Sequence, residues 1–281
     1  MTNQIKSENK PLPALHLVYG NPDFPKLDQD TLAKAIQEVN PKINEHSIKA
    51  RWVFQEIEKC LGELQFDQHM IRFAGLSTPL PQEIVDRTIH PSPWGAQIKA
   101  AMRQHQSQLS LVYAGSHHDP VEQMIALYQA AHAFSSEDLL GVLNQNAWTA
   151  HPPGDYLSPE KIQSYREVIP FNLWVGYVKF FVDEENYWLV TKGHHIFDVP
   201  DLAYFMRPNE NAEEIINQFI NIFYYIFEQD VVVTAGDTLE ISKKGQYLKF
   251  SEVSEGADFL LGPSGTLVIE KITPDDIAQQ G

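Results

Sequence analysis

The apolar residues of this chain come in short stretches separated by turn residues, and this pattern limits the length of every element that can form. The longest dense apolar stretch, Ile215–Phe227, is interrupted by Asn217, Gln218 and Asn221. A helix that spans a bilayer needs about 20 consecutive, mostly apolar residues, so we expect no transmembrane span. The stretch Met1–Pro13 is polar and lacks an apolar core, so we expect no signal peptide either.

Length and cysteine content narrow the class of protein. The chain has 281 residues, of which 43% are hydrophobic and 11% aromatic, enough for one large core or two coupled cores. Its single cysteine, Cys60, excludes an internal disulfide and a zinc site built on cysteines. This usage fits a reducing compartment. We therefore expect a cytoplasmic globular protein that is flexible only at residues 1–13 and 273–281.

The first half of the chain predicts the element order strand, helix, two strands, helix, strand. The expected strands are Ala14–Tyr19, 63–66, 70–74 and 109–114, and the expected helices run from Asp28 toward Val39, over 48–61 and over 94–104. This order is that of a split βαβ, ferredoxin-like sheet. We expect it to form an α+β half over residues 14–115.

The second half predicts longer helices and a hairpin. Helices are expected over 121–134, from Ser135 or Ser136 onward, and over 212–229; strands over 171–182, 187–191, 231–233, 238–241, 247–250 and 266–272; and a loop over 151–158. We expect residues 116–272 to form an acidic α+β half that makes one continuous globule with the first. The predicted class is α+β, with a ferredoxin-like N-terminal half packed on antiparallel strands with two or more long helices.

The negative charge of the chain lies in its second half. Residues 1–115 carry 12 Lys or Arg and 12 Asp or Glu, whereas residues 116–281 carry 9 and 25, which accounts for the whole net charge of −16. Such a field repels nucleic acid and anionic lipid and attracts cationic surfaces. We expect a basic protein partner, and neither nucleic acid nor a membrane.

Six short motifs occur in a recognisable order. They are Leu76-Ser77-Thr78-Pro79-Leu80-Pro81, Trp94, Ser135-Ser136-Glu137-Asp138-Leu139-Leu140, Leu173-Trp174-Val175, Thr191-Lys192-Gly193 and Ala235-Gly236-Asp237-Thr238. Together they resemble the bacterial domain-of-unknown-function family numbered 4261, from about Leu15 to Ile272. The resemblance implies an α+β fold and bacterial origin, with no established chemistry. The family typically continues Thr-x-Gly with a Gly and a Glu, where this chain has His194–Asp198, so no role tied to those positions carries over.

Two histidine pairs have the composition of metal ligands but not the arrangement. His117-His118-Asp119 forms one group, and His194-His195 with Asp198 forms the other. Adjacent histidines on a strand or turn usually point to opposite sides, so each pair offers one ligand at most. The ordinary interpretation, exposed histidines beside acidic groups in turns, is the one we adopt. We expect no metal site.

The sequence lacks the common motifs of catalytic and nucleotide-binding sites. Gly-x-Ser-x-Gly, Walker-type and Gly-x-Gly-x-x-Gly motifs are absent, and no Lys follows Gly262-Pro263-Ser264-Gly265 into a helix. Cys60, near the end of an expected helix, is best interpreted as a small buried hydrophobe. Carboxylates such as those of Asp183-Glu184-Glu185 are usually solvated in turns rather than tuned as general acids. We expect no catalytic residue and no cofactor.

The remaining candidates suit binding. Trp148, with His151 and Tyr156 around a Pro-Gly loop, has the profile of an interface anchor, although a core position is the alternative. Acidic stretches at 183–185, 198–201, 210–214 and 252–258 would form a charged rim, or simply a solvated face. The candidate partner-binding residues are Trp148, His151, Tyr156, Asp183, Glu184, Glu185, His194, His195, Asp198, Asp201, Glu213 and Glu214.

These features favour a non-enzymatic bacterial binding protein, most concretely an immunity protein that occludes a basic secreted toxin encoded nearby. An acidic chain with few motifs suits a tight inhibitor of a cationic enzyme, which needs complementary charge and aromatic anchors. The alternatives are an enzyme of unknown type with a cleft at Trp148–Asp155 and His194–Asp198, and a regulatory or scaffold module. Convergence of the acidic residues beside Trp148 would favour binding.

Overall fold

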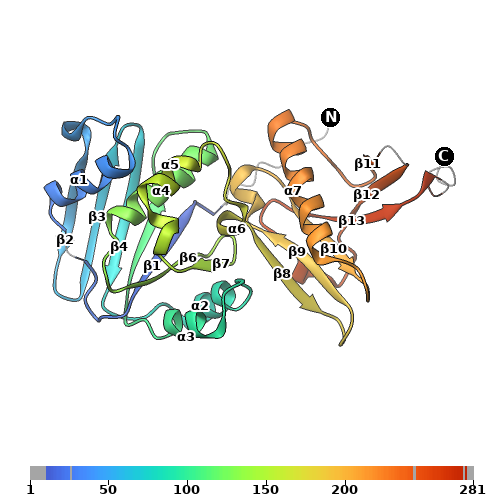
Figure 1. Ribbon diagram of the computed structural model, residues 1–281, viewed down its shortest axis with the longest axis horizontal. Coiled ribbons are helices and arrows are strands. Elements are labelled where there is room, and N and C mark those ends of the chain that lie inside the picture. Colours follow the sequence, from blue (N-terminus) through green and yellow to red (C-terminus); the bar gives the residue numbers. More distant parts are fainter. Residues whose placement is uncertain (1–10, 26, 243–244, 275, 277–281) are drawn as a thin grey trace. The chain divides into compact units, whose positions relative to one another are not determined.

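The computed structural model describes residues 11–25, 27–242, 245–274 and 276. They form two compact units, each with its own sheet (Figure 1). We call residues 12–174 the N-terminal unit and the described residues of 175–276 the C-terminal unit. Both units mix helices with mostly antiparallel strands, which confirms the predicted α+β class.

The N-terminal unit is built on a seven-stranded sheet with the order β2-β3-β4-β5-β1-β6-β7. Its strands are β1 (Ala14–Tyr19), β2 (Lys49–Gln55), β3 (Lys59–Phe66), β4 (His69–Leu76), β5 (Ser107–Tyr113), β6 (Leu139–Asn144) and β7 (Thr149–His151). Every neighbouring pair in this sheet is antiparallel. In β3 buried and more exposed residues alternate, as the period of two in a strand requires.

Helices lie between the strands in sequence, and several of them pack against the sheet. They are α1 (Gln29–Val39), η1 (Glu45–Ser47), α2 (Gln82–Ile89), α3 (Ala96–Arg103), α4 (Pro120–Ala133), η2 (Gly154–Leu157), α5 (Pro159–Ser164) and α6 (Phe171–Trp174). Asp119 caps α4 by accepting a hydrogen bond from the N–H of Val121, and Pro120 occupies its first turn. α4 contacts β1, β4 and β5, whereas α2 contacts β6 and β7.

The C-terminal unit has a six-stranded sheet with the order β11-β12-β13-β10-β9-β8. Its strands are β8 (Gly176–Phe181), β9 (Tyr187–Lys192), β10 (Asp201–Met206), β11 (Thr238–Ser242), β12 (Gln246–Glu252) and β13 (Thr266–Ile272), joined by η3 (His194–Phe197), α7 (Ala212–Gln229) and η4 (Asp258–Leu260). The β10–β13 pair is parallel, and the other pairs are antiparallel.

Helix α7 has the bounds predicted from the sequence. Asn211 caps it by accepting a hydrogen bond from the N–H of Glu213, 2.9 Å away. Asp230, in the left-handed region at φ 50°, ends it. The helix contacts β10 (Figure 1), and one face of it is buried through Ile215, Phe219, Ile222, Phe223 and Ile226.

The ferredoxin-like arrangement predicted for residues 14–115 is not confirmed. The segment 48–61, predicted to be helical, instead forms β2 and the start of β3. Trp52 and Phe54 lie two residues apart on β2, and a bulge between them shifts the register with β3. Cys60 is buried, as expected, but it lies in β3 rather than in a helix.

The two units meet at a different point of the chain from the predicted boundary at 115/116. Ser135 does not begin a helix: its hydroxyl donates to the carbonyl of His132, 2.7 Å away, at the end of α4. The apolar run that follows forms β6, which pairs with β1. Because this pairing ties the region after residue 115 to the first strand, the chain divides after Trp174 instead.

Smaller differences concern the second half and the ends. Residues 171–174 are helical and the hairpin strand begins at Gly176, while residues 231–233 lie outside any strand. The flexible segments predicted at 1–13 and 273–281 fall mostly outside the described residues. Within the first, Pro13 is buried and its carbonyl accepts a hydrogen bond from the N–H of Tyr113.

Candidate functional site

The C-terminal sheet splits between its two parallel strands. β10 and β13 pair only over three positions, from Asp201 with Thr266 to Ala203 with Val268. Beyond this point β10 remains paired with β9 as far as Met206, and β13 remains paired with β12 as far as Ile272. The two strands therefore diverge while each keeps its other neighbour.

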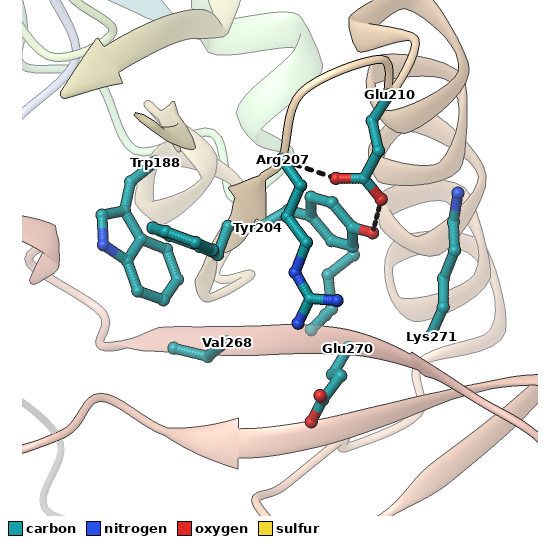
Figure 2. A pocket seen from close by; sticks show the side chains of 9 residues that line it. Trp188, Tyr204, Arg207, Glu210, Val268, Glu270 and Lys271 are labelled. Carbon is teal, nitrogen blue, oxygen red and sulfur yellow. Dashed lines mark hydrogen bonds between the residues drawn. The ribbon is translucent and has the colours of Figure 1, made fainter. Parts of the chain in front are cut away.

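A groove with a volume of about 500 Å³ lies at this split. We call it the split groove. Its lining residues come from β9, β10, β13 and the turn before α7, and they are Trp188, Tyr204, Phe205, Arg207, Glu210, Val268, Ile269, Glu270 and Lys271 (Figure 2). The groove thus combines aromatic rings with side chains of both charges, a composition typical of binding sites.

Two aromatic side chains form one wall of the groove. Trp188 on β9 is directly opposite Phe205 on β10, so both lie on one face of the sheet. Their ring centroids are 5.1 Å apart in an edge-to-face arrangement. Both side chains are half-buried. They leave apolar area for a ligand while the strands fix their positions.

A carboxylate organises the turn beside them. The hydroxyl of Tyr204 donates to Oε1 of Glu210 at 2.7 Å, and the backbone N–H of Arg207 donates to Oε2 of Glu210 at 2.7 Å. Both oxygens of Glu210 are therefore engaged within the protein (Figure 2). Burial, and then the hydrogen bond to Glu210, raises the pKa of Tyr204, which keeps its hydroxyl protonated as a donor.

Three further charges line the groove. The side chain of Arg207 is exposed, and within the described residues its guanidinium has no hydrogen-bond or ion-pair partner. Figure 2 shows this guanidinium between the ring of Tyr204 and the strand that carries Val268 and Glu270. Lys271 places its Nζ 5.7 Å from the ring centroid of Tyr204, a cation–π distance.

A buried lysine holds a loop onto the same face of the sheet. We call residues 253–265 the strap. Nζ of Lys192, at the end of β9, donates to the carbonyls of Leu260 at 3.0 Å and Leu261 at 3.2 Å. Leu260 also packs with Val190 and Ala203 in an apolar cluster that includes Trp188. The strap therefore supports the strands that carry the groove.

Asp201 lies beneath the strap at the start of β10. Its Oδ1 accepts long hydrogen bonds from the Thr191 hydroxyl at 3.4 Å and the His194 N–H at 3.3 Å. Its Oδ2 is buried and has no hydrogen-bond partner in the described structure. Burial raises the pKa of Asp201 to about 7, although Lys192 acts in the opposite direction. A Cβ on Gly262 would lie 2.0 Å from Oδ2, so only glycine fits there.

Four of the predicted partner-binding residues are buried rather than exposed. His194, His195 and Asp201 lie inside the C-terminal unit, and His151 lies inside the N-terminal unit. Nε2 of His151 is 3.0 Å from the hydroxyl of Tyr128, and the two rings stack. Burial lowers the pKa of His151 to about 4. All four side chains are packed inside the protein, and His151, His194 and Asp201 form hydrogen bonds there.

The other predicted residues lie on separate elements. In the N-terminal unit, Trp148 is half-buried with the guanidinium of Arg87 5.1 Å from its ring centroid, and Tyr156 packs against Trp94. In the C-terminal unit, the exposed carboxylates lie in the β8–β9 turn, after η3 and in the first turn of α7: Asp183, Glu184, Glu185, Asp198, Glu213 and Glu214.

None of the twelve predicted residues lines the split groove. Sequence reasoning missed it because its two edges are strands far apart in the chain. One local signal was present: the consecutive aromatic residues Tyr204 and Phe205 in a strand, followed by Arg207. Because side chains alternate along a strand, two adjacent aromatic residues must face opposite sides of the sheet.

The predicted histidine groups serve local structure. Nδ1 of His117 accepts a hydrogen bond from the N–H of Asp119, 3.2 Å away, and Asp119 caps α4. Among the described residues no three His, Cys, Asp or Glu side chains are placed to hold a metal ion. The described helices also include none that is long and apolar enough to cross a membrane.

Comparison with known families locates a match in this region. A family model described as Domain of unknown function (DUF4261) matches residues 190–270, which confirms the resemblance within these residues. The matched stretch runs from Val190 on β9 to Glu270 on β13, and it includes β10, α7, the strap and most of the lining of the split groove. Searches of curated proteins and of solved structures gave no match.

Proposed function

We propose that this protein binds a segment of another protein in the split groove, as an immunity protein that occludes a basic toxin. The observation that carries this proposal is the split itself: Trp188 and Phe205 provide apolar anchors beside two strand edges that no longer pair with each other. Aromatic anchors dominate protein interfaces, and free strand edges bind extended segments.

The distribution of charge supports a basic partner. Residues 175–281 contain 18 Asp or Glu and 7 Lys or Arg, whereas the longer segment 12–174 contains 18 and 12. The groove therefore lies in the more acidic unit. Exposed carboxylates in the β8–β9 turn and at the start of α7 add to this field. Such a field attracts a cationic protein and speeds the encounter.

The chemistry of the groove favours binding over catalysis. Burial and the hydrogen bond to Glu210 move the pKa of Tyr204, a lining residue, further above its ordinary value of 10.0. A general acid or base works best with a pKa near the operating pH. The oxygens of Glu210 are held by Tyr204 and by the backbone of Arg207. These contacts fix a surface rather than prepare a proton transfer.

The proposal is tested by co-expression with the product of the adjacent gene. An immunity protein abolishes the toxicity of its neighbour and binds it directly. Trp188→Ala should weaken that binding at least tenfold, since central aromatic anchors contribute about 2 kcal/mol or more. Tyr225→Ala removes an exposed aromatic side chain from α7 and is the matched control. A neighbour that is neither toxic nor bound would contradict the proposal.

A further inference from the structure

Resting on the proposed function, we infer that the split groove binds one extended segment, which adds as a strand between β10 and β13 and places a carboxylate on Arg207. The inference combines three observations: the early end of the β10–β13 ladder, the alternation of side chains on either side of the split, and a guanidinium without a partner among the described residues.

The backbone groups at the split can pair with an added strand. After Ala203 and Val268, the edges of β10 and β13 that face each other no longer pair, although both strands stay extended and paired on their outer sides. Backbone N–H and C=O groups on such edges are ready to pair with an added chain. An extended peptide supplies these groups at the required spacing, whereas a compact ligand does not.

The two faces of the split differ. Ala203 pairs with Val268, so Phe205 and Glu270, each two residues further along, lie on one face together with Trp188. Tyr204 and Lys271 lie on the other face, where Nζ of Lys271 approaches the ring of Tyr204. A strand in the split therefore turns alternate side chains toward the aromatic wall.

The positive charge of Arg207 favours an acidic side chain of the bound segment next to the aromatic wall. Glu210 forms no ion pair with the guanidinium of Arg207 in the described structure; its two oxygens accept from the Tyr204 hydroxyl and from the backbone N–H of Arg207. The guanidinium lies over the strand that carries Val268 and Glu270 (Figure 2) with its planar donors available. A guanidinium matches a carboxylate in a two-point hydrogen-bonded pair. A bound segment thus has an apolar residue for Trp188 and Phe205 and an acidic residue two positions away.

The test is selection of a phage-displayed random peptide library on the full-length chain. We expect enriched sequences in which an apolar and an acidic residue are separated by one position. In the synthetic peptide, replacing the acidic residue by its amide should weaken binding about tenfold or more. N-methylation at alternate backbone positions should abolish binding. No enrichment, or binding that survives N-methylation at every position, would overturn the inference.

A charge reversal tests the role of Arg207 itself. Arg207→Glu should lose the acidic peptides and enrich sequences with Lys or Arg at the same position. Lys179→Glu on β8 changes the charge of the same unit equally and should leave the selection unchanged. Identical results for the two variants would refute the assignment. The two proposals can fail separately. If the neighbouring toxin binds, and Trp188→Ala weakens its binding, but no peptide is selected, only the inference of an added strand fails. If peptides bind but the neighbouring protein does not, the immunity proposal fails.

Discussion

Asp201 has the most unusual environment among the described residues. Its Oδ2 is buried without a hydrogen-bond partner in the described structure, and a Cβ on Gly262 would lie 2.0 Å from it. Burial disfavours the charged form of a carboxylate, and this raises the pKa of Asp201 to about 7. The proton is therefore held more tightly in the folded chain than in the unfolded chain.

This environment predicts a pH-dependent contribution to stability. Because the folded pKa of about 7 lies above the ordinary value of 3.8, the contribution of Asp201 is fully present below about pH 4 and is lost as pH rises to 7. Buried His151 and His194, with pKa values of about 4, act in the opposite direction. The variant Asp201→Asn removes this ionisable carboxyl group. Between pH 4 and 7 the melting temperature of the variant should therefore rise relative to that of the wild type. A constant difference across that range would contradict the prediction.

The hydroxyl of Tyr204 provides a second test on a single residue. Tyr204→Phe removes the donor to Glu210 but keeps the ring beneath Lys271. We expect a loss of about 1 kcal/mol in the free energy of unfolding, a typical value for one hydrogen bond. Urea denaturation would measure it. Binding should weaken as well, because Glu210 then keeps only its contact with the backbone N–H of Arg207 and holds the turn less firmly; unchanged binding would show that the turn does not depend on the Tyr204 contact.

Single elements show what the sequence can predict. The bounds of α7 match the prediction, which rested on apolar residues at helical spacing, and the structure adds the N-cap at Asn211. In residues 48–61, by contrast, Trp52, Phe54, Ile57 and Leu61 fit a helical spacing, yet the segment forms a strand, a turn and a second strand. Pairing of β3 with β4, which lies outside the segment, decides this outcome. The spacing of apolar residues within the segment could not by itself distinguish a helix from two strands.

The strap is an element whose fit depends on one glycine. A methyl group at Gly262 would lie 2.0 Å from Oδ2 of Asp201, so Gly262→Ala must displace the strap from Lys192 or shift β10. We expect a destabilisation of about 1–3 kcal/mol, as for an overpacked core, together with weaker binding in the groove. Gly95→Ala, where nothing lies within 4 Å of the added carbon, is the control. Thermal unfolding of both variants would check this, and equal melting temperatures would contradict it.

For the whole molecule, the charge asymmetry seen in the sequence follows the division into units only in part, because residues 12–174 also carry an acidic excess, 18 Asp or Glu against 12 Lys or Arg. The chain divides after Trp174, and the segment beyond it carries the larger acidic excess. The sequence therefore indicated that the larger acidic excess lies in the later part of the chain. It could not indicate the groove, because that site needs β10 and β13, more than sixty residues apart, to pair over three positions and then diverge.

The central claim is that a protein partner binds at the split between β10 and β13. Hydrogen–deuterium exchange of the full-length chain, with and without its bound partner, tests this most directly. We predict that binding slows exchange at the backbone amides of residues 204–207 and 269–271, where the two strands no longer pair with each other. Slowed exchange confined to residues 12–174, with unchanged exchange at the split, would contradict the claim.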